Sequence, residues 1–364
     1  MANPVITVVV SQGQSRNPEK RALEEGISQA AAQLDGCLVM TVPHLYDVAP
    51  DGETIKSLQA ITGPILLFSW LYERAAHWVL DRNAIRGQVG LVELTPDEDD
   101  EDEDEDEDKD EAEKTERVVD WQPRPDRHIY CVDMRASEKL DAFVEELKRI
   151  CDAEKARIQS AVPAVSAESL ARFTQPTNDT ALAIDGSGKL ALNHQLFQLN
   201  AVNSIDEHPS RRWYPVIDFS RCTNCMECID FCLFGVYGVD GAETILVEQP
   251  DNCRKGCPAC SRVCPQNAII FPQHKTPAIA GAPVDAGGFK IDLSKLFGAP
   301  ENNDDAAAAA ARERDEQLIL AGRQAVGNTL AASGKSESGP APAKPPAEKD
   351  ELDKLVDQLD ALDL

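Results

Sequence analysis

Residues 222–232 read Cys-Thr-Asn-Cys-Met-Glu-Cys-Ile-Asp-Phe-Cys, a C-x2-C-x2-C-x3-C run, and a second run, C-x3-C-x2-C-x3-C-P, spans residues 253–265. Eight of the eleven cysteines thus fall within 43 residues, and such clustering at short, fixed spacing is typical of metal ligands. A cubane iron-sulfur cluster has four iron corners. Three cysteines of one tight loop can cap three corners, so the fourth ligand must come from elsewhere. Two such loops facing each other would supply each other's fourth ligand.

The two runs resemble those of the bacterial ferredoxins that carry two 4Fe-4S clusters, over about 60 residues from about 213 to 275. In that family the fourth cysteine of each run ligates the cluster of the other run. The resemblance implies that one cluster is held by Cys222, Cys225, Cys228 and Cys264. It implies that the second cluster is held by Cys232, Cys253, Cys257 and Cys260.

The chain departs from the family pattern at two points. Leu233 replaces the proline usually found after the first run, and the second run opens with three intervening residues instead of two. Neither change removes a sulfur. Between the runs, Gly241 and residues 244–247 indicate a turn and a strand that join the two halves, and residues 268–271 would cover one cluster.

The implied clusters favour an electron carrier over an enzyme. With every iron capped by a thiolate, the site can pass single electrons but has no open position for a substrate. The alternative is a redox enzyme or chelatase-like protein in which the clusters serve a small-molecule or tetrapyrrole site in the N-terminal domain. Two tetrahedral zinc ions are the alternative metal, although structural zinc sites favour paired C-x2-C knuckles.

The N-terminal part alternates short apolar runs with amphipathic stretches, which predicts an α/β domain with a mostly parallel sheet. The expected strands are 5–10, 37–42, 64–71, 88–94 and 128–133. The expected helices are 18–34, 52–61, 73–83 and 137–157. Asn17 and Pro18 indicate the cap and the first position of the first helix. Cys37, Cys131 and Cys151 are isolated, and we expect them to be small core residues.

Composition divides the chain further. In residues 97–113, 15 of 17 side chains are acidic, so this segment cannot offset its own ordering entropy. We therefore expect an α/β domain at 1–157 with a disordered acidic insertion at 96–117, and a connector at 158–212. A small α+β ferredoxin-type domain with two clusters follows at 213–299. The segment 300–364 would hold a helix over 306–330, a flexible linker and a terminal amphipathic helix.

Four polar side chains are candidates for a small-molecule site in the N-terminal domain. Gln12 and Ser15 follow the first strand, His44 follows the second, and His77 lies in the third helix. They could meet in the crevice at the carboxyl ends of the strands, where open α/β sheets bind ligands. The alternative is that both histidines have only a structural role, as hydrogen-bonded residues. The first strand and its loop resemble the start of class II (sirohydrochlorin-type) chelatases, with Gln12 in the place of a metal-handling histidine.

Overall charge and hydropathy indicate which classes of partner and which compartment to expect. With a net charge of −27, we expect no nucleic-acid partner, and we expect redox partner proteins with a basic docking surface. The acidic insertion would be either a solvated loop or a docking arm for such a partner. The chain shows neither a signal peptide nor an apolar run of about 20 residues, so no membrane span is expected. Thiols that bind metal indicate a reducing cytoplasm.

Overall fold

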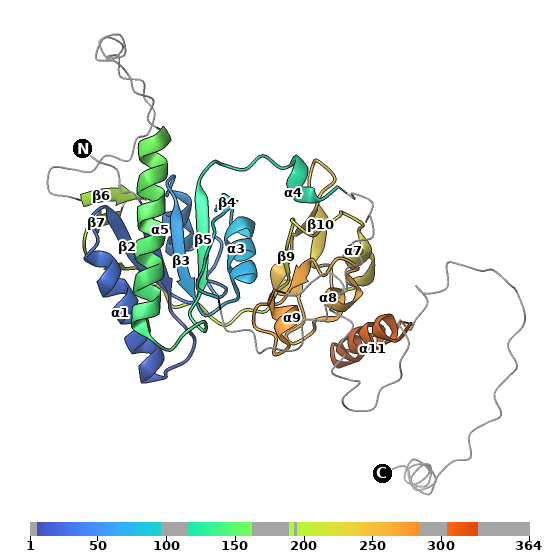
Figure 1. The fold of residues 1–364 in the computed structure, drawn as a ribbon. Helices are drawn as coiled ribbons and strands as arrows, with labels where there is room; N and C mark the ends of the chain where they lie inside the picture. Colours follow the sequence, from blue (N-terminus) through green and yellow to red (C-terminus); the bar gives the residue numbers. More distant parts are fainter. Residues whose placement is uncertain (1–5, 96–115, 162–188, 193–194, 284–303, 327–364) are drawn as a thin grey trace, which may run out of the picture. The chain divides into compact units, whose positions relative to one another are not determined.

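The computed structural model describes residues 6–95, 116–161, 189–192, 195–283 and 304–326 (Figure 1). Its N-terminal part is built on a six-stranded sheet in which all five strand pairings are parallel. In order across the sheet, the strands are β4 (Gln88–Val89), β5 (His128–Asp133), β3 (Ile65–Ser69), β1 (Ile6–Ser11), β2 (Cys37–Val42) and β8 (Val202–Ser204). The expected α/β domain with a mostly parallel sheet is confirmed.

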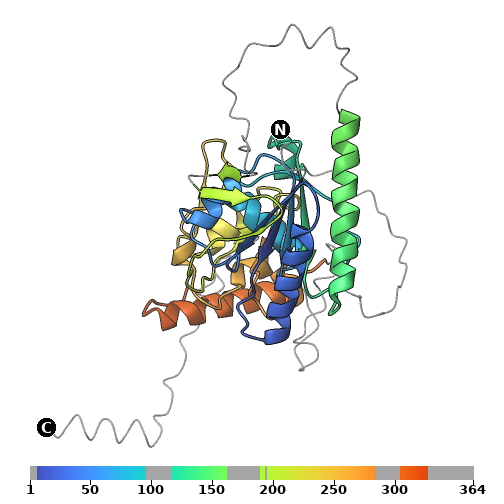
Figure 2. The ribbon, with the colours of Figure 1, turned by 90° about the vertical axis from the view of Figure 1, so that its left-hand side faces the viewer.

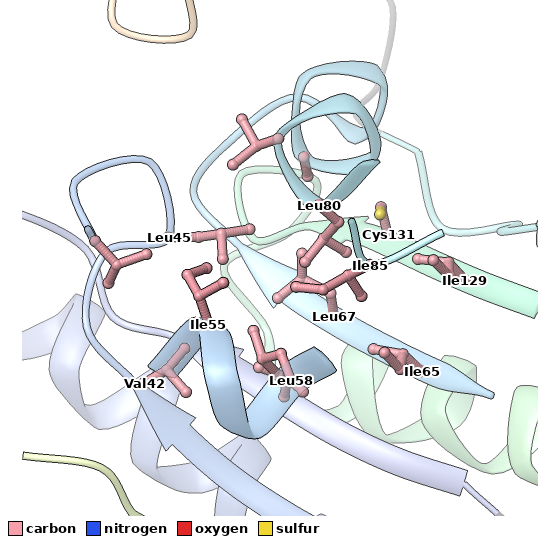
Figure 3. Close-up of a cluster of buried hydrophobic side chains, with 14 of the residues drawn as sticks. Val42, Leu45, Ile55, Leu58, Ile65, Leu67, Leu80, Ile85, Ile129 and Cys131 are labelled. Carbon is pink, nitrogen blue, oxygen red and sulfur yellow. The ribbon is translucent and has the colours of Figure 1, made fainter. Parts of the chain in front are cut away.

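Helices cover both faces of this sheet. One face packs against α1 (Pro18–Ala32) and α5 (Leu140–Ala161), which lie on the same side of the strands in Figure 2. The other packs against α2 (Glu53–Gln59) and α3 (Glu73–Arg82). Figure 3 shows this second core, in which Ile55, Leu67 and Leu80 come from α2, β3 and α3. Because both faces are buried, the strands read as continuous apolar runs.

Local sequence signals account for the element boundaries. The side chain of Asn17 accepts a hydrogen bond from the backbone N–H of Glu19, and Pro18 opens α1 as expected. The strand β4 is shorter than the expected 88–94. After Val89 the chain turns toward α5, where the backbone N–H of Glu93 donates to Glu146. Cys37, Cys131 and Cys151 are buried in the cores, as expected.

The region expected to be a connector contributes structure to the sheet. β6 (Lys189–Leu192) pairs with β7 (Gln195–Gln198) in an antiparallel hairpin, and β8 then joins β2 as an edge strand. The amide of Asn203 secures this edge by donating to the backbone carbonyl of Val39. The three residues of β8 have little apolar character and show no strand pattern in the sequence. The edge of β2 therefore decides that β8 pairs with it.

The cysteine-rich part is a small α+β unit. Its strands are β9 (Val216–Ile217), β10 (Tyr237–Val239), β11 (Ile245–Val247) and β12 (Ile269–Ile270). Its helices are α7 (Glu227–Phe231), the 3-10 turn η1 (Pro250–Asn252), α8 (Ala259–Val263) and α9 (Pro277–Ala280). β9 pairs with β12 and β10 with β11, both antiparallel. The turn between β10 and β11 holds Gly241, so the expected turn and strand are present.

Two helices from outside this unit pack against it. The short helix α4 (Val118–Trp121) buries Val118 in the apolar cluster that contains Cys222 and Cys228. The helix α11 (Asp304–Leu320) packs against α8 (Figure 1). It ends before the expected residue 330 because Gly322 adopts a left-handed backbone (φ 71°), and its N–H donates to the carbonyl of Ile319.

Two further predictions fall outside the described residues. These are the acidic insertion at 96–117, except for its last two positions, and the linker and terminal amphipathic helix of the C-terminal segment. In the part of the chain that is described, no helix combines the length and the apolar character needed to cross a membrane.

The sheet and the cysteine-rich unit share a specific interface. The rings of Tyr46 and Tyr214 stack with their centroids 4.2 Å apart, and the hydroxyl of Tyr214 donates to the carbonyl of Tyr46 at 2.9 Å. Arg74 of α3 forms an ion pair with the buried carboxylate of Asp218 and donates to the carbonyl of Asn267. Residues of α3 are therefore held beside the loop that leads to Cys222.

Candidate metal centre

Cys222, Cys225, Cys228 and Cys264 form the first cysteine set. They line one cavity together with apolar side chains that include Ile217, Ile245 and Ile269. Asn224 and Met226 adopt left-handed backbone conformations (φ 59° and 65°), which bend the chain between successive cysteines. The amide of Asn224 fixes the loop to β11, because its oxygen accepts from the N–H of Ile245 at 2.9 Å.

The thiols of the first set lie close enough to influence one another. Burial is the largest cause that raises the pKa of Cys222 to about 11, and the neighbouring Cys264 and Cys225 contribute to this rise. Burial raises the pKa of Cys228 to about 12, again with contributions from Cys264, Cys222 and Cys225. Cys264, from the second run, is thus a neighbour of all three cysteines of the first run. Thiols with raised pKa values are neutral at pH 7, so metal binding there must release protons.

Cys232, Cys253, Cys257 and Cys260 form the second cysteine set. Burial is the largest cause that raises the pKa of Cys253 and Cys260, and the neighbouring Cys232 and Cys257 add to it. Cys232 also raises the pKa of Cys257, after burial. The last cysteine of the first run is therefore grouped with the cysteines that open the second run. The ligand roles of both sets remain predictions.

Hydrogen bonds reach sulfurs in both sets. In the first set the donors are backbone N–H groups, from Asn224 to Cys222 at 3.5 Å and from Ala268 to Cys264 at 3.3 Å. In the second set the hydroxyl of Tyr237 donates to the sulfur of Cys260 at 3.1 Å. Such bonds stabilise a thiolate ligand and tune a cluster's reduction potential. Tyr237 was not among the residues expected from the sequence, because a tyrosine five residues beyond the first run is more typical of a core position.

The chemistry of these groups fits a cubane. Each set offers four thiols from two separate segments around an apolar site, which is what a cube with four iron corners requires. Among the described residues, no three histidine, cysteine or acidic side chains are arranged to hold a single metal ion.

The four candidates for a small-molecule crevice lie in different surroundings. Gln12 donates its backbone N–H to the carbonyl of Val42, and the exposed hydroxyl of Ser15 accepts from the N–H of Asn17. The Nδ1 atom of His44 lies 3.3 Å from a carboxylate oxygen of Asp47. His77 instead lines a cavity between α3 and the loop before Cys222. Whether any of these side chains binds a ligand remains a prediction.

An indole ring lies against the loop at the carboxyl end of β1. A Cβ atom placed on Gly13 would lie 2.8 Å from the ring of Trp70, and both residues donate to the carboxylate of the buried Glu24. The strand order reverses between β1 and β3, where open α/β sheets bind ligands. In this chain the side chain of Trp70 lies at that position.

Comparison with known proteins bears on part of the chain. No protein-family model matches it, and no solved structure matches it. An uncharacterized ferredoxin of Methanocaldococcus jannaschii is 48% identical over 66 residues. This chain contains a ferredoxin-like segment. The matched residues make up 18% of this chain and 44% of the relative, so the chain spans less than half of that protein's length. These comparisons give no support to the resemblance to class II chelatases.

Proposed function

We propose that the chain is an iron-sulfur electron-transfer protein of the ferredoxin type, which passes single electrons through two 4Fe-4S clusters. The observation that carries the proposal is the cavity that Cys264 of the second run lines together with Cys222, Cys225 and Cys228 of the first run. The partial identity with a ferredoxin supports the same chemistry. When bound, a 4Fe-4S cluster supplies a one-electron redox centre.

The residues around the two sets would determine how each centre behaves. Cys222, Cys225, Cys228 and Cys264 would hold one cluster, and Cys232, Cys253, Cys257 and Cys260 the other. Cys225 is exposed, whereas Cys260 is buried. We therefore propose that a partner protein exchanges electrons at the first set, on the side of Cys225. The apolar side chains around each set would exclude water from the buried sulfurs.

The partner would carry a basic docking surface, because opposite charge accelerates encounter and the chain has a net charge of −27. All eleven cysteines are unpaired, which suits a reducing compartment such as the cytoplasm. Electron transfer to a basic partner should slow as ionic strength rises. A rate that does not change with salt would contradict this choice of partner.

The proposal is tested by anaerobic purification of the full chain, followed by iron, sulfide and zinc analysis. We expect about eight irons and eight sulfides per chain, a brown colour, and two signals in EPR during a reductive titration. A colourless protein with stoichiometric zinc would refute the cluster assignment. A protein with about four irons would show that one set of cysteines has another role.

A further inference from the structure

A cavity of about 340 Å³, with several charged side chains in its lining, lies between α3, the β4–β5 edge of the sheet and the loop that leads to Cys222. It differs from the crevice expected at the carboxyl ends of the strands. Its charged and titratable lining is Glu73, Arg74, His77, Arg124, Asp218 and Arg221. None of these residues belongs to either cysteine set, so the proposed electron-transfer function leaves the cavity unexplained.

His77 is the first indication that the cavity receives a ligand. Its side chain is only 4% exposed, and neither ring nitrogen has a hydrogen-bond partner among the described residues. Burial and the positive charge of Arg124 lower the pKa of His77 to about 4, so the ring is neutral at pH 7. Buried polar groups in native proteins are nearly always hydrogen-bonded. An unpartnered neutral imidazole can donate to a ligand with one nitrogen and accept with the other.

Two arginines keep unused donors at the same cavity. Arg74 bonds Asp218 and the carbonyl of Asn267 through Nε and Nη2, and its buried Nη1 has no partner in the described part of the chain. The Nη1 of Arg124 lies 2.8 Å from a carboxylate oxygen of Asp81, while its Nε and Nη2 are buried with no hydrogen-bond partner in the described segments. A guanidinium with two adjacent N–H donors matches the oxygens of a carboxylate or an oxyanion.

The charge of the cavity is opposite to that of the whole chain. Three arginines and two acidic side chains line the cavity, and Asp81 behind Arg124 pairs with both Arg124 and Arg86. With Asp81 and Arg86 included, four arginines face three carboxylates, so the formal excess is one positive charge in a protein of charge −27. Burial, together with the carboxylates of Asp133 and Glu146, raises the pKa of Glu73 to about 7. Glu73 is therefore partly protonated at neutral pH, which increases the positive excess. A pocket with an excess of positive charge attracts small anions.

We propose that this cavity binds a small anion with charged oxygens, either a carboxylate or an inorganic oxyanion, between Arg74 and Arg124, with His77 as a third partner. Ser220 and Arg221 also line the cavity and directly precede Cys222. The anion would therefore lie beside the first cysteine set. The inference goes beyond the proposed function and does not depend on it, because the binding groups are all side chains outside the two sets.

Isothermal titration calorimetry of the full chain tests this site. Sodium sulfate, phosphate, acetate and bicarbonate are each titrated into the protein, with sodium chloride at equal ionic strength as the reference. We expect saturable binding of at least one anion at one site per chain. Arg124→Gln should weaken it at least about tenfold, because a charge-assisted hydrogen bond is lost. Arg157→Gln is the matched control, because Arg157 pairs with Glu154 on α5 and does not line the cavity.

The outcomes distinguish between the two classes of anion, and they test the anion site separately from the cluster proposal. Binding of sulfate or phosphate alone would identify a tetrahedral oxyanion, and binding of acetate or bicarbonate alone a carboxylate. Heats no larger than those of chloride in the folded wild-type chain would overturn the inference, as would equal weakening in Arg157→Gln. His77→Phe, which removes both ring nitrogens, should weaken binding and provides a second variant if Arg124→Gln does not fold. Iron analysis of the same sample tests the cluster proposal separately.

Discussion

The two cysteine sets are braced by different parts of the chain. The first set is backed by α4, where the N–H of Val118 donates to the carbonyl of Cys222 at 2.9 Å, and its Cys225 is exposed. The second set is covered by α11, whose Ala310 and Ala311 pack in one apolar cluster with Cys257. An ion pair between Arg262 and Glu313, with atoms 3.0 Å apart, holds this helix in place.

This difference shows how one ligand pattern acquires two environments. The cysteine spacing is nearly the same in the two runs, yet the segments that cover them come from distant parts of the chain. Solvent access and hydrogen bonds to sulfur set the reduction potential of a cluster. We therefore expect the second cluster to be the more protected of the two, and the first to be the one that meets a partner.

The largest expected effect tests the division into two sets. Cys264→Ala and Cys222→Ala should each lower the iron content from about eight to about four per chain, because each removes one corner of the same cluster. Combining them should cause no further loss. Combining Cys222→Ala with Cys232→Ala should remove nearly all iron. Cys131→Ala, at a buried position in β5, is the control that should keep all of it. Complete loss in the first combination would contradict the division.

The next effect tests the cover over the second set. Ala311→Glu places an unpaired carboxylate where the side chain is 6% exposed, so α11 should leave its position. The visible absorbance of the second set's cluster should then bleach in air at least about fivefold faster. The absorbance of the first set's cluster, about half of the total, should decay at its original rate. Arg312→Glu adds the same side chain to the exposed face of the same helix and should change neither rate. Equal acceleration of both halves would show that α11 protects the sets alike.

A smaller effect tests the support of the first set. Val118 is fully buried beside Cys222 and Cys228, so Val118→Ala should lower the free energy of unfolding by about 1–2 kcal/mol. The measurement is the urea midpoint, followed by circular dichroism. Val89→Ala removes the same atoms where the side chain is 72% exposed and should leave the midpoint unchanged. Similar midpoints for the two variants would mean that α4 adds nothing to the first set.

The smallest effect tests the hydrogen bond to Cys260. Tyr237→Phe removes the hydroxyl donor, which stabilises the more negative reduced state, so the potential of the second cluster should fall by about 40 mV. The first cluster should keep its potential in the same redox-titrated EPR experiment. Tyr130→Phe removes a hydroxyl that bonds Glu154 on α5 and is the control. A shift of both clusters in Tyr237→Phe would indicate a general change of structure.

The residues that line the proposed anion cavity gave weaker signals in the sequence than the cysteines did. Glu73 and His77 stand four residues apart, on one face of α3, and this spacing could have indicated a shared surface. Arg124 and Asp218 gave no such signal, because they reach the cavity from other segments. Burial of an unpartnered imidazole is a property of the packed structure, and no pattern in the residues around His77 encodes it.

The sequence by itself determined the elements whose signals are local. Continuous apolar runs predicted four of the buried strands, and Asn17 with Pro18 predicted the start of α1. The cysteine spacing predicted the two ligand loops. The resemblance to ferredoxins already implied which cysteines share a set. Only the tertiary structure decided which helices cover the two sets, and that β8 completes the sheet. Local signals act between near neighbours through backbone sterics and side-chain period. Contacts between distant segments depend on which buried surfaces pack together, and spacing along the chain does not record this.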